Sequence, residues 1–191
     1  MHLVFLALLL GSYLLGSIPF GYLVCRAKKL NIREIGSGNI GATNVYRALG
    51  FKWAVLVGLL DLGKGALPTL LATQLMESQI LFLIVGIAAI AGHNWPVFLG
   101  FKGGRGVATT GGVVLVLMPV ISLIAVGIWA LVVKITRFVS LGSIAVAVIF
   151  PIMAFFQSAV YFYFTLFLAL VIIVQHRPNI KRLLSGEENR V

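Results

Sequence analysis

The sequence has few acidic residues and only one cysteine. Cys25 has no second thiol to pair with, so the sequence excludes a disulfide within the chain. Asp61 is the only aspartate, and aspartate and glutamate together number 5. Hard cations such as Mg²⁺ require several oxygen ligands, and so few carboxylates do not supply them at one place. We therefore predict no metal site and no other cofactor.

Charged residues of either sign are also scarce. They make up 10% of the 191 residues, whereas 60% are hydrophobic; soluble domains carry about 25% charged residues. We therefore predict an integral membrane protein, with residues 1–191 forming a single domain. The net charge of +10 does not indicate nucleic acid here, because the basic residues lie between apolar runs, where they meet anionic lipid headgroups or anionic substrates.

The apolar runs predict an all-α, polytopic transmembrane bundle. Residues 3–25 lack the features of a cleaved signal and are long enough to span a bilayer. The basic stretch 26–52 is predicted to be cytoplasmic by the positive-inside rule, which places the N-terminus outside. The basic tail 176–191 is likewise predicted to be cytoplasmic. The other predicted spans are residues 53–75, 80–99, 138–156 and 159–175.

The run 107–133 leaves two interpretations open. A single span places the basic residues Lys134 and Arg137 outside, whereas two short helices broken at Gly111–Gly112 or Met118–Pro119 keep them inside. Short helices are tolerated in a membrane only where their ends are buried in protein or line a wet cavity. The charge pattern favours the broken arrangement and about seven helices in total.

A glycine-rich, basic segment at residues 100–106 is the strongest candidate for an anion site. Glycines allow backbone N–H groups to approach an anion, and lysine and arginine supply positive charge. A plain loop whose basic residues meet lipid headgroups is an equally weighted alternative. The segment lacks the Gly-Lys-Ser/Thr ending of a P-loop. Its candidate phosphate-binding residues are Lys102, Gly103, Gly104, Arg105 and Gly106.

The loop 36–47 is dense in neutral hydrogen-bonding residues, which suits a hydroxylated, phosphorylated small molecule. A turn-rich loop with helix caps is the alternative. Ser37 has no base within the motif, so a donor role is favoured over a nucleophile. The candidate residues are Ser37, Asn39, Thr43, Asn44 and Arg47.

Further candidate residues carry polar groups next to or inside apolar runs. Lys64 lies three residues after Asp61, and the pair either brings Lys64 toward a substrate anion or is purely structural. His93 is placed to support the glycine segment. In the tail, His176, Asn179 and Glu188 can fold back over a cytoplasmic pocket; a basic flank alone does not explain Asn179 or the paired acids.

Together these motifs resemble one known family. SGNIGATN at 37–44, GHNWPVF at 92–98, KGGRGVAT at 102–109 and HRPNI at 176–180 look like the cytoplasmic motifs of the bacterial acyl-phosphate:glycerol-3-phosphate acyltransferases. The resemblance covers nearly the whole chain. It implies transfer of a fatty acyl group from acyl phosphate to the 1-hydroxyl of glycerol 3-phosphate at the cytoplasmic face of the bacterial inner membrane, with lysophosphatidic acid and phosphate as products.

The resemblance also implies residue roles. Residues expected to act in catalysis are Ser37, Arg47, Lys102, His176, Asn179 and Glu188. Residues expected to bind substrate are Asn39, Thr43, Asn44, Lys64, His93, Gly103, Gly104, Arg105 and Gly106. We expect a monomer in contact with membrane lipid and no nucleic-acid partner. The alternative from another class is a small transporter for a phosphorylated metabolite; the gathering of polar motifs on one face disfavours it.

Overall fold

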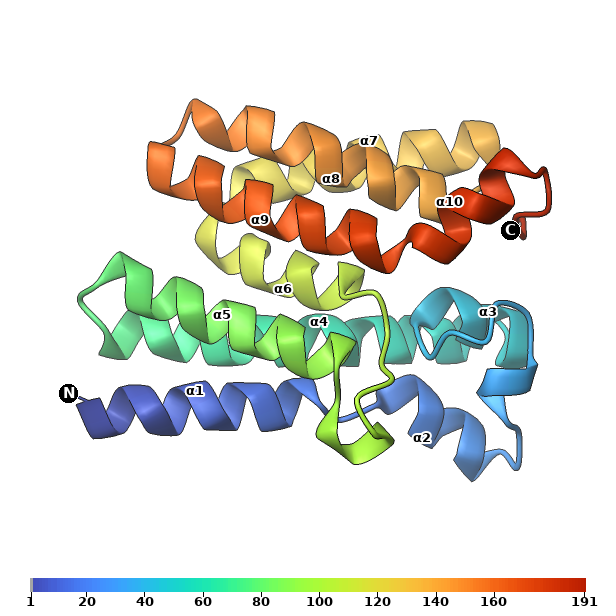
Figure 1. The fold of residues 1–191 in the computed structure, drawn as a ribbon, viewed down its shortest axis with the longest axis horizontal. Helices are drawn as coiled ribbons and strands as arrows, with labels where there is room; N and C mark the ends of the chain where they lie inside the picture. The colour runs from blue at the N-terminus through green and yellow to red at the C-terminus, as the bar shows by residue number, and fades with distance from the viewer. Residues whose placement is uncertain (1) are drawn as a thin grey trace. The chain divides into compact units, whose positions relative to one another are not determined.

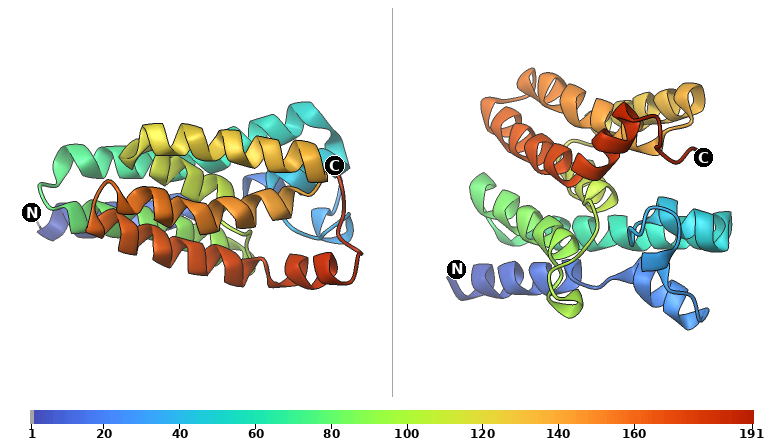
Figure 2. Two further views of the ribbon diagram at one scale, coloured as in Figure 1. Left: turned by 90° about the horizontal axis from the view of Figure 1, so that it is seen from above. Right: turned by 45° about the vertical axis from the view of Figure 1, so that its right-hand side comes forward.

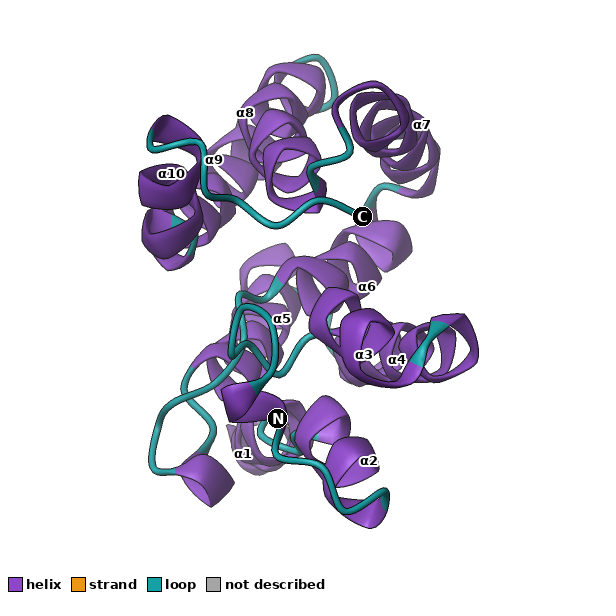
Figure 3. Ribbon diagram, turned by 90° about the vertical axis from the view of Figure 1, so that its right-hand side faces the viewer, coloured by secondary structure: helices purple, strands orange, loops and turns teal. Residues whose placement is uncertain are grey.

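The structure is a computed structural model that describes residues 2–191. These residues form ten α-helices and two short 3₁₀-helices and include no strand (Figure 3). The chain divides into two compact units, Met1–Leu117 and Met118–Val191. The predicted all-α class is confirmed, and the single domain stays a prediction.

The first unit contains six α-helices. In Figure 1, α1, α4 and α5 lie side by side and α6 packs against α4. Its elements are α1 (His2–Gly16), α2 (Phe20–Ala27), α3 (Ala42–Leu49), α4 (Phe51–Leu75), α5 (Gln79–Asn94) and α6 (Val107–Leu117), with 3₁₀-helices at Ile32–Glu34 and Val97–Leu99.

Glycines let these helices approach one another closely. A Cβ at Gly65 of α4 would overlap the carbonyl of Thr109 in α6, and one at Gly112 of α6 would overlap the carbonyl of Leu62 in α4. Small residues at such contacts are typical of membrane helices, where association depends on packing rather than on the hydrophobic effect. The predicted break at Gly111–Gly112 is therefore wrong: α6 continues through it, and Gly112 serves the contact with α4.

The first apolar run is interrupted, which the single helix predicted over residues 3–25 did not anticipate. α1 ends at Gly16 and α2 begins at Phe20. Pro19 has no N–H to continue the helical hydrogen bonds, so the ladder breaks before it. The interruption lies beside polar groups of α4 that are described below.

The second unit contains α7 (Pro119–Thr136), α8 (Val139–Phe155), α9 (Ala159–Gln175) and α10 (Arg177–Leu184). α8 packs against both α7 and α9, as Figure 2 shows. Pro119 occupies the first position of α7, where its missing N–H is no loss, so the predicted break at Met118–Pro119 is confirmed. α9 and α10 meet at a bend of 59°.

By length and composition, 4 helices among residues 2–191 can cross a membrane, or up to 5 if α9 and α10 count as one bent span. The first of these, His2–Ala27, includes the interruption before Pro19. With 11 residues, α6 is about 16 Å long, roughly half the apolar thickness of a bilayer. The prediction of about seven helices counted α1 and α2 as one helix and did not count α3 and α10. The predicted orientation in the membrane stays a prediction.

A small apolar core supports the loop before α3. It consists of buried side chains from α2, the loop, α3 and α4, namely Cys25, Ile32, Ile40, Val45 and Val57. Gly21 of α2 lies directly against the carbonyl of Ile40, so the helix and the loop pack without a gap. The polar loop is thus held by a core of its own.

Candidate active site

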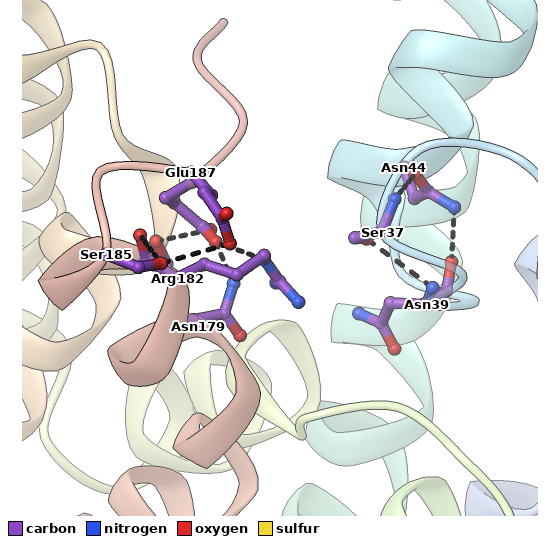
Figure 4. A network of polar contacts seen from close by, with 9 residues as sticks. Ser37, Asn39, Asn44, Asn179, Arg182, Ser185 and Glu187 are labelled. Atoms are coloured by element: carbon purple, nitrogen blue, oxygen red, sulfur yellow. Dashed lines mark hydrogen bonds and ion pairs between the residues drawn. The ribbon is translucent and has the colours of Figure 1, made fainter.

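Asn44 organises the loop that precedes α3. Its side chain is buried, and its Nδ2 donates to the carbonyls of Ile35 (2.8 Å) and Asn39 (2.9 Å) and, at 3.2 Å, to that of Ile32. Its Oδ1 accepts the N–H of Ser37 at 3.1 Å (Figure 4). The amide of Asn44 is therefore committed to the backbone of the loop.

The other predicted residues of this loop are more accessible. Ser37, Asn39, Thr43 and Arg47 are all partly exposed. Thr43 and Arg47 lie one turn apart on α3 and therefore share a face. The Arg47 side chain passes close to Gly36, whose φ of +54° favours glycine. The structure therefore brings these four side chains to the surface that Asn44 shapes.

The glycine segment is clamped to the end of α5 by its own backbone. The N–H of Gly103 donates to the carbonyl of Asn94 at 3.1 Å, and that of Gly104 donates to the carbonyl of His93 at 3.0 Å. These two amides satisfy carbonyls near the end of the helix and are not available for an anion. Gly104 also lies against the imidazole of His93, so that any Cβ there would overlap Nε2.

The ends of the segment carry the groups that can meet an anion. Lys102 is exposed, and its carbonyl accepts a hydrogen bond from the guanidinium of Arg33, which ties the Ile32–Glu34 turn to the segment. Arg105 is partly exposed, and α6 begins at Val107 with its unshared N–H groups at that end.

Three buried polar side chains lie on the elements that meet at this point. The Asn94 amide and the hydroxyls of Thr109 and Thr110 have no hydrogen-bond partner among residues 2–191. The Asn94 side chain lies against Gly106, whose φ is +79°. Buried groups of this kind are normally satisfied, so they are candidates for contact with a polar ligand or water. The sequence prediction assigned no role to them.

Lys64 forms a buried ion pair with Asp61, with 2.9 Å between Nζ and Oδ1. Its Nζ also donates to the carbonyl of Ile18 at 2.9 Å and lies 5.6 Å from the centre of the Phe20 ring. The Nδ1 atom of His93 is 3.6 Å from the same Asp61 oxygen. Lys64 is thus directed at the interruption between α1 and α2.

In the second unit, Glu188 is the centre of a polar network. Its Oε1 accepts hydrogen bonds from Ser140 Oγ (2.8 Å) and Asn179 Nδ2 (2.5 Å), and its Oε2 accepts one from Arg182 Nε (2.7 Å). The Glu188 side chain is only 5% exposed. Figure 4 shows Asn179 and Arg182 on α10 beside the chain that follows it. The carboxylate therefore fastens the tail to α8 and α10.

The acidity of Glu188 reflects this network. Burial by itself raises the pKa of the Glu188 carboxyl, but the hydrogen bonds from Asn179, Ser140 and Arg182, together with the charge of Arg182, outweigh it and lower the pKa below its usual value. The residue is therefore ionised at neutral pH and acts as a hydrogen-bond acceptor.

His176 lies at the junction of α9 and α10 and is buried. Its Nδ1 is 2.8 Å from the carbonyl of Ile172. A carbonyl can only accept, so Nδ1 carries the proton, and in the neutral ring Nε2 is the basic nitrogen. The second unit thus brings His176, Asn179 and Glu188 onto α10 and its flanks.

Comparison with known proteins identifies the family. The model of the family described as glycerol-3-phosphate acyltransferase matches residues 6–186. The chain belongs to the glycerol-3-phosphate acyltransferase family. The glycerol-3-phosphate acyltransferase of Thermoanaerobacter pseudethanolicus is 46% identical over 183 residues, covering 94% of this chain and 92% of the relative. That of Desulforamulus reducens is 44% identical over 193 residues, covering 100% and 96%.

Solved structures agree with this acyltransferase in fold. The crystal structure of PlsY (YgiH), an integral membrane glycerol 3-phosphate acyltransferase, in its glycerol 3-phosphate form, matches with a TM-score of 0.95 at 40% identity, covering 98% of this chain and 96% of that one. A second form of the same protein, with lysophosphatidic acid, matches with a TM-score of 0.91. The predicted family and the enzymatic class are confirmed, and the transporter alternative is set aside.

Sequence reasoning missed four residues of the acyltransferase that the structure brings into contact with predicted ones: Arg33, Asn94, Ser140 and Arg182. Arg33 and Arg182 lie in basic stretches that the positive-inside rule already explained. Ser140 carries no local signal, because only the returning tail gives it a partner. Within residues 2–191 no group of three or more His, Cys, Asp or Glu residues could hold a metal ion.

Proposed function

We propose that this acyltransferase moves a fatty acyl group from acyl phosphate to the 1-hydroxyl of glycerol 3-phosphate and releases lysophosphatidic acid and phosphate. One observation carries the proposal: the solved relative, 40% identical, has a glycerol 3-phosphate form and a lysophosphatidic acid form. These two molecules differ by one acyl group on a hydroxyl, so they stand as acceptor and product of one reaction.

The charge of the first unit supports a phosphorylated acceptor. We assign Lys102 and Arg105 to the phosphate, because both flank the clamped glycines and both are at least partly exposed. Arginine can bind a phosphate with two parallel hydrogen bonds. The start of α6 adds backbone N–H groups, and the buried Asn94 amide adds a polar group beside it.

The roles of several predicted residues are revised by their contacts. Ser37, Asn39, Thr43 and Arg47 keep the assignment to substrate, since their side chains reach the surface. Four other predicted residues are assigned to positioning because of their contacts within the fold. Asn44 holds the loop, Lys64 pairs with Asp61 and donates to Ile18, His93 lies against Gly104, and Glu188 fastens the tail.

Acyl phosphate is a mixed anhydride, so its phosphate leaves without strong acid assistance, and the acceptor hydroxyl still has to lose a proton. We assign that proton to a phosphate oxygen of a substrate, which titrates near neutral pH. His176 is the protein group that competes for this role, because Nε2 is the basic nitrogen of its neutral ring. His176→Asn should keep measurable turnover with its pH dependence; abolished turnover with intact substrate binding would assign the proton to His176.

We place the reaction at the cytoplasmic face of the bacterial inner membrane, with the N-terminus outside and the C-terminus inside. The positive charge of stretch 26–52 and of the tail 176–191 supports this orientation. We propose a monomer in which apolar helix faces meet lipid, consistent with the exposure of many large apolar side chains along α1, α4 and α7.

The test is acyl transfer by the purified protein in detergent, where no second compartment exists. Incubation with acyl phosphate and glycerol 3-phosphate should yield lysophosphatidic acid and inorganic phosphate in equal amounts. Parallel reactions contain acyl-CoA or acyl carrier protein instead. Product formed only with one of those two donors would refute acyl phosphate as the donor while leaving the acceptor assignment in place.

A further inference from the structure

The buried charges of α4 lie between two points in the first unit where the backbone leaves a helix. On one side, Lys64 donates to the carbonyl of Ile18, in the interruption before Pro19. On the other side, Asp61 lies 3.6 Å from His93, at the end of α5, where the chain leaves the helix toward the glycine segment. The Asp61 and Lys64 side chains are 3% and 1% exposed.

Stability alone does not explain why a buried ion pair is present here. Removing two charges from water is unfavourable, and replacing a buried ion pair by apolar residues is often neutral or stabilising. Inside a membrane protein, polar groups of this kind are tied to function or to breaks in the backbone. Lys64 accounts for the break at Ile18, but it does not account for the approach of His93 to Asp61.

His93 explains that approach. Its ring lies directly beneath Gly104, with no room for a Cβ between them, and its carbonyl accepts the N–H of Gly104 at 3.0 Å. A displacement of the imidazole therefore displaces the backbone of Gly103 and Gly104. These two residues stand between Lys102 and Arg105, the residues assigned to the phosphate of glycerol 3-phosphate.

We propose that Asp61 is a positioning residue for the phosphate-binding segment, acting through His93 and Gly104. Its carboxylate holds the Lys64 ammonium at the carbonyl of Ile18, in the interruption between α1 and α2. The same carboxylate holds the His93 imidazole beneath the glycines, so one buried anion positions both groups. The functional half of this inference rests on the proposed function. The structural half, that Asp61 fixes the backbone of residues 103–104, does not.

Amide hydrogen exchange at Gly103 and Gly104, without substrate, tests the structural half. Asp61→Asn should accelerate exchange there by about tenfold or more, because the negative charge that faces Nδ1 of His93 at 3.6 Å is lost. Thr69→Val is the matched control: Thr69 is a fully buried polar residue of the same helix, and its hydroxyl donates to the carbonyl of Gly65 within that helix. It should leave exchange at the two glycines unchanged. Equal exchange in wild type and Asp61→Asn would overturn the inference.

A double variant separates positioning from the destabilisation caused by a buried lysine that has lost its counter-ion. Asp61→Asn/Lys64→Met removes the unpaired ammonium and keeps a side chain of similar length, so it should fold even if Asp61→Asn does not. Exchange at Gly103 and Gly104 should remain fast in it; protection restored to the wild-type level would refute a role through His93. In addition, His93→Gln should accelerate exchange by itself, and adding Asp61→Asn to it should have little further effect.

Kinetics test the functional half. Asp61→Asn/Lys64→Met should raise KM for glycerol 3-phosphate by about tenfold or more, with kcat within about threefold of wild type. A purely structural role would lower stability and leave KM unchanged, which would refute the assignment. Absence of turnover in the wild-type protein would instead refute the proposed function, and the exchange result would still stand.

Discussion

The fastening of the tail by Glu188 leads to a quantitative prediction. Glu188→Gln keeps the shape of the side chain and retains one oxygen for Ser140 and Asn179, but it points an NH₂ group at the N–H of Arg182. One charge-assisted hydrogen bond, worth about 1.5–3 kcal/mol, is lost, and the two others now have a neutral acceptor. Because Arg182 is 26% exposed, solvent screens part of the loss. We expect a local loss of about 2–3 kcal/mol.

Amide exchange in the tail measures this loss locally. The N–H of Glu187 donates to the carbonyl of Arg182 at 2.8 Å, and that of Val191 donates to the carbonyl of Arg137 at 3.0 Å. Exchange of both amides should accelerate by about 30- to 150-fold in Glu188→Gln. Glu187→Gln is the control, because the adjacent Glu187 is exposed and its carboxylate accepts a hydrogen bond from Ser185 Oγ (3.1 Å), outside the Glu188 network. It should change exchange by about twofold at most.

The stabilisation that Glu188 contributes depends on pH in a definite direction. The folded state lowers the pKa of Glu188, so its stabilisation is fully present above the unfolded pKa of about 4.3 and disappears as the pH falls through the lower, folded value. Wild type and Glu188→Gln should therefore differ at pH 7, and the difference should shrink only as the pH falls below the unfolded pKa and through the lower, folded one. Equal effects of the two glutamine variants at pH 7 would refute the fastening role.

Three further predictions follow from the site. Asn44→Ala should lower kcat/KM for glycerol 3-phosphate by about tenfold or more, because four backbone groups of the loop lose their hydrogen-bond partner. The control is Asn31→Ala, at an exposed asparagine before the same loop, which should change kcat/KM by less than about threefold. In a Cys25→Ala background, Ser78→Cys should react with an impermeant thiol reagent added outside intact cells, and Lys102→Cys and Ser185→Cys should be protected; outside labelling of either would reverse the orientation. Activity should survive EDTA, and a loss that magnesium or zinc restores would reveal a metal ligand set.

The sequence predicted those parts of the fold that depend on local signals. The span 159–175 coincides with α9, and Pro119 marks the start of α7. Apolar length and a missing N–H are properties of a short segment, so they can be read without knowing the neighbours. The interruption before Pro19 was missed although it has the same cause, because the surrounding run is long and apolar enough to read as one span.

The site was predicted only as far as residue type allows. Asn44 and Glu188 were singled out as polar residues near the substrate, which their hydrogen-bonding capacity suggests. Their partners decide their role, and these include backbone carbonyls five to twelve residues away for Asn44 and Ser140, 48 residues away, for Glu188. Nothing in the local sequence distinguishes a side chain that faces a ligand from one whose polar atoms are already occupied.

The glycine segment shows why this distinction matters for experiments. Its glycines were predicted to expose N–H groups to phosphate, yet those of Gly103 and Gly104 bond to carbonyls of α5. A substitution such as Gly104→Val would collide with the His93 ring and raise KM whether or not the backbone touches phosphate. Lys102→Gln is the more informative change, because the Lys102 side chain is exposed and its backbone carbonyl can still accept from Arg33. An increase in KM for glycerol 3-phosphate in that variant therefore reports on the lost charge and not on packing.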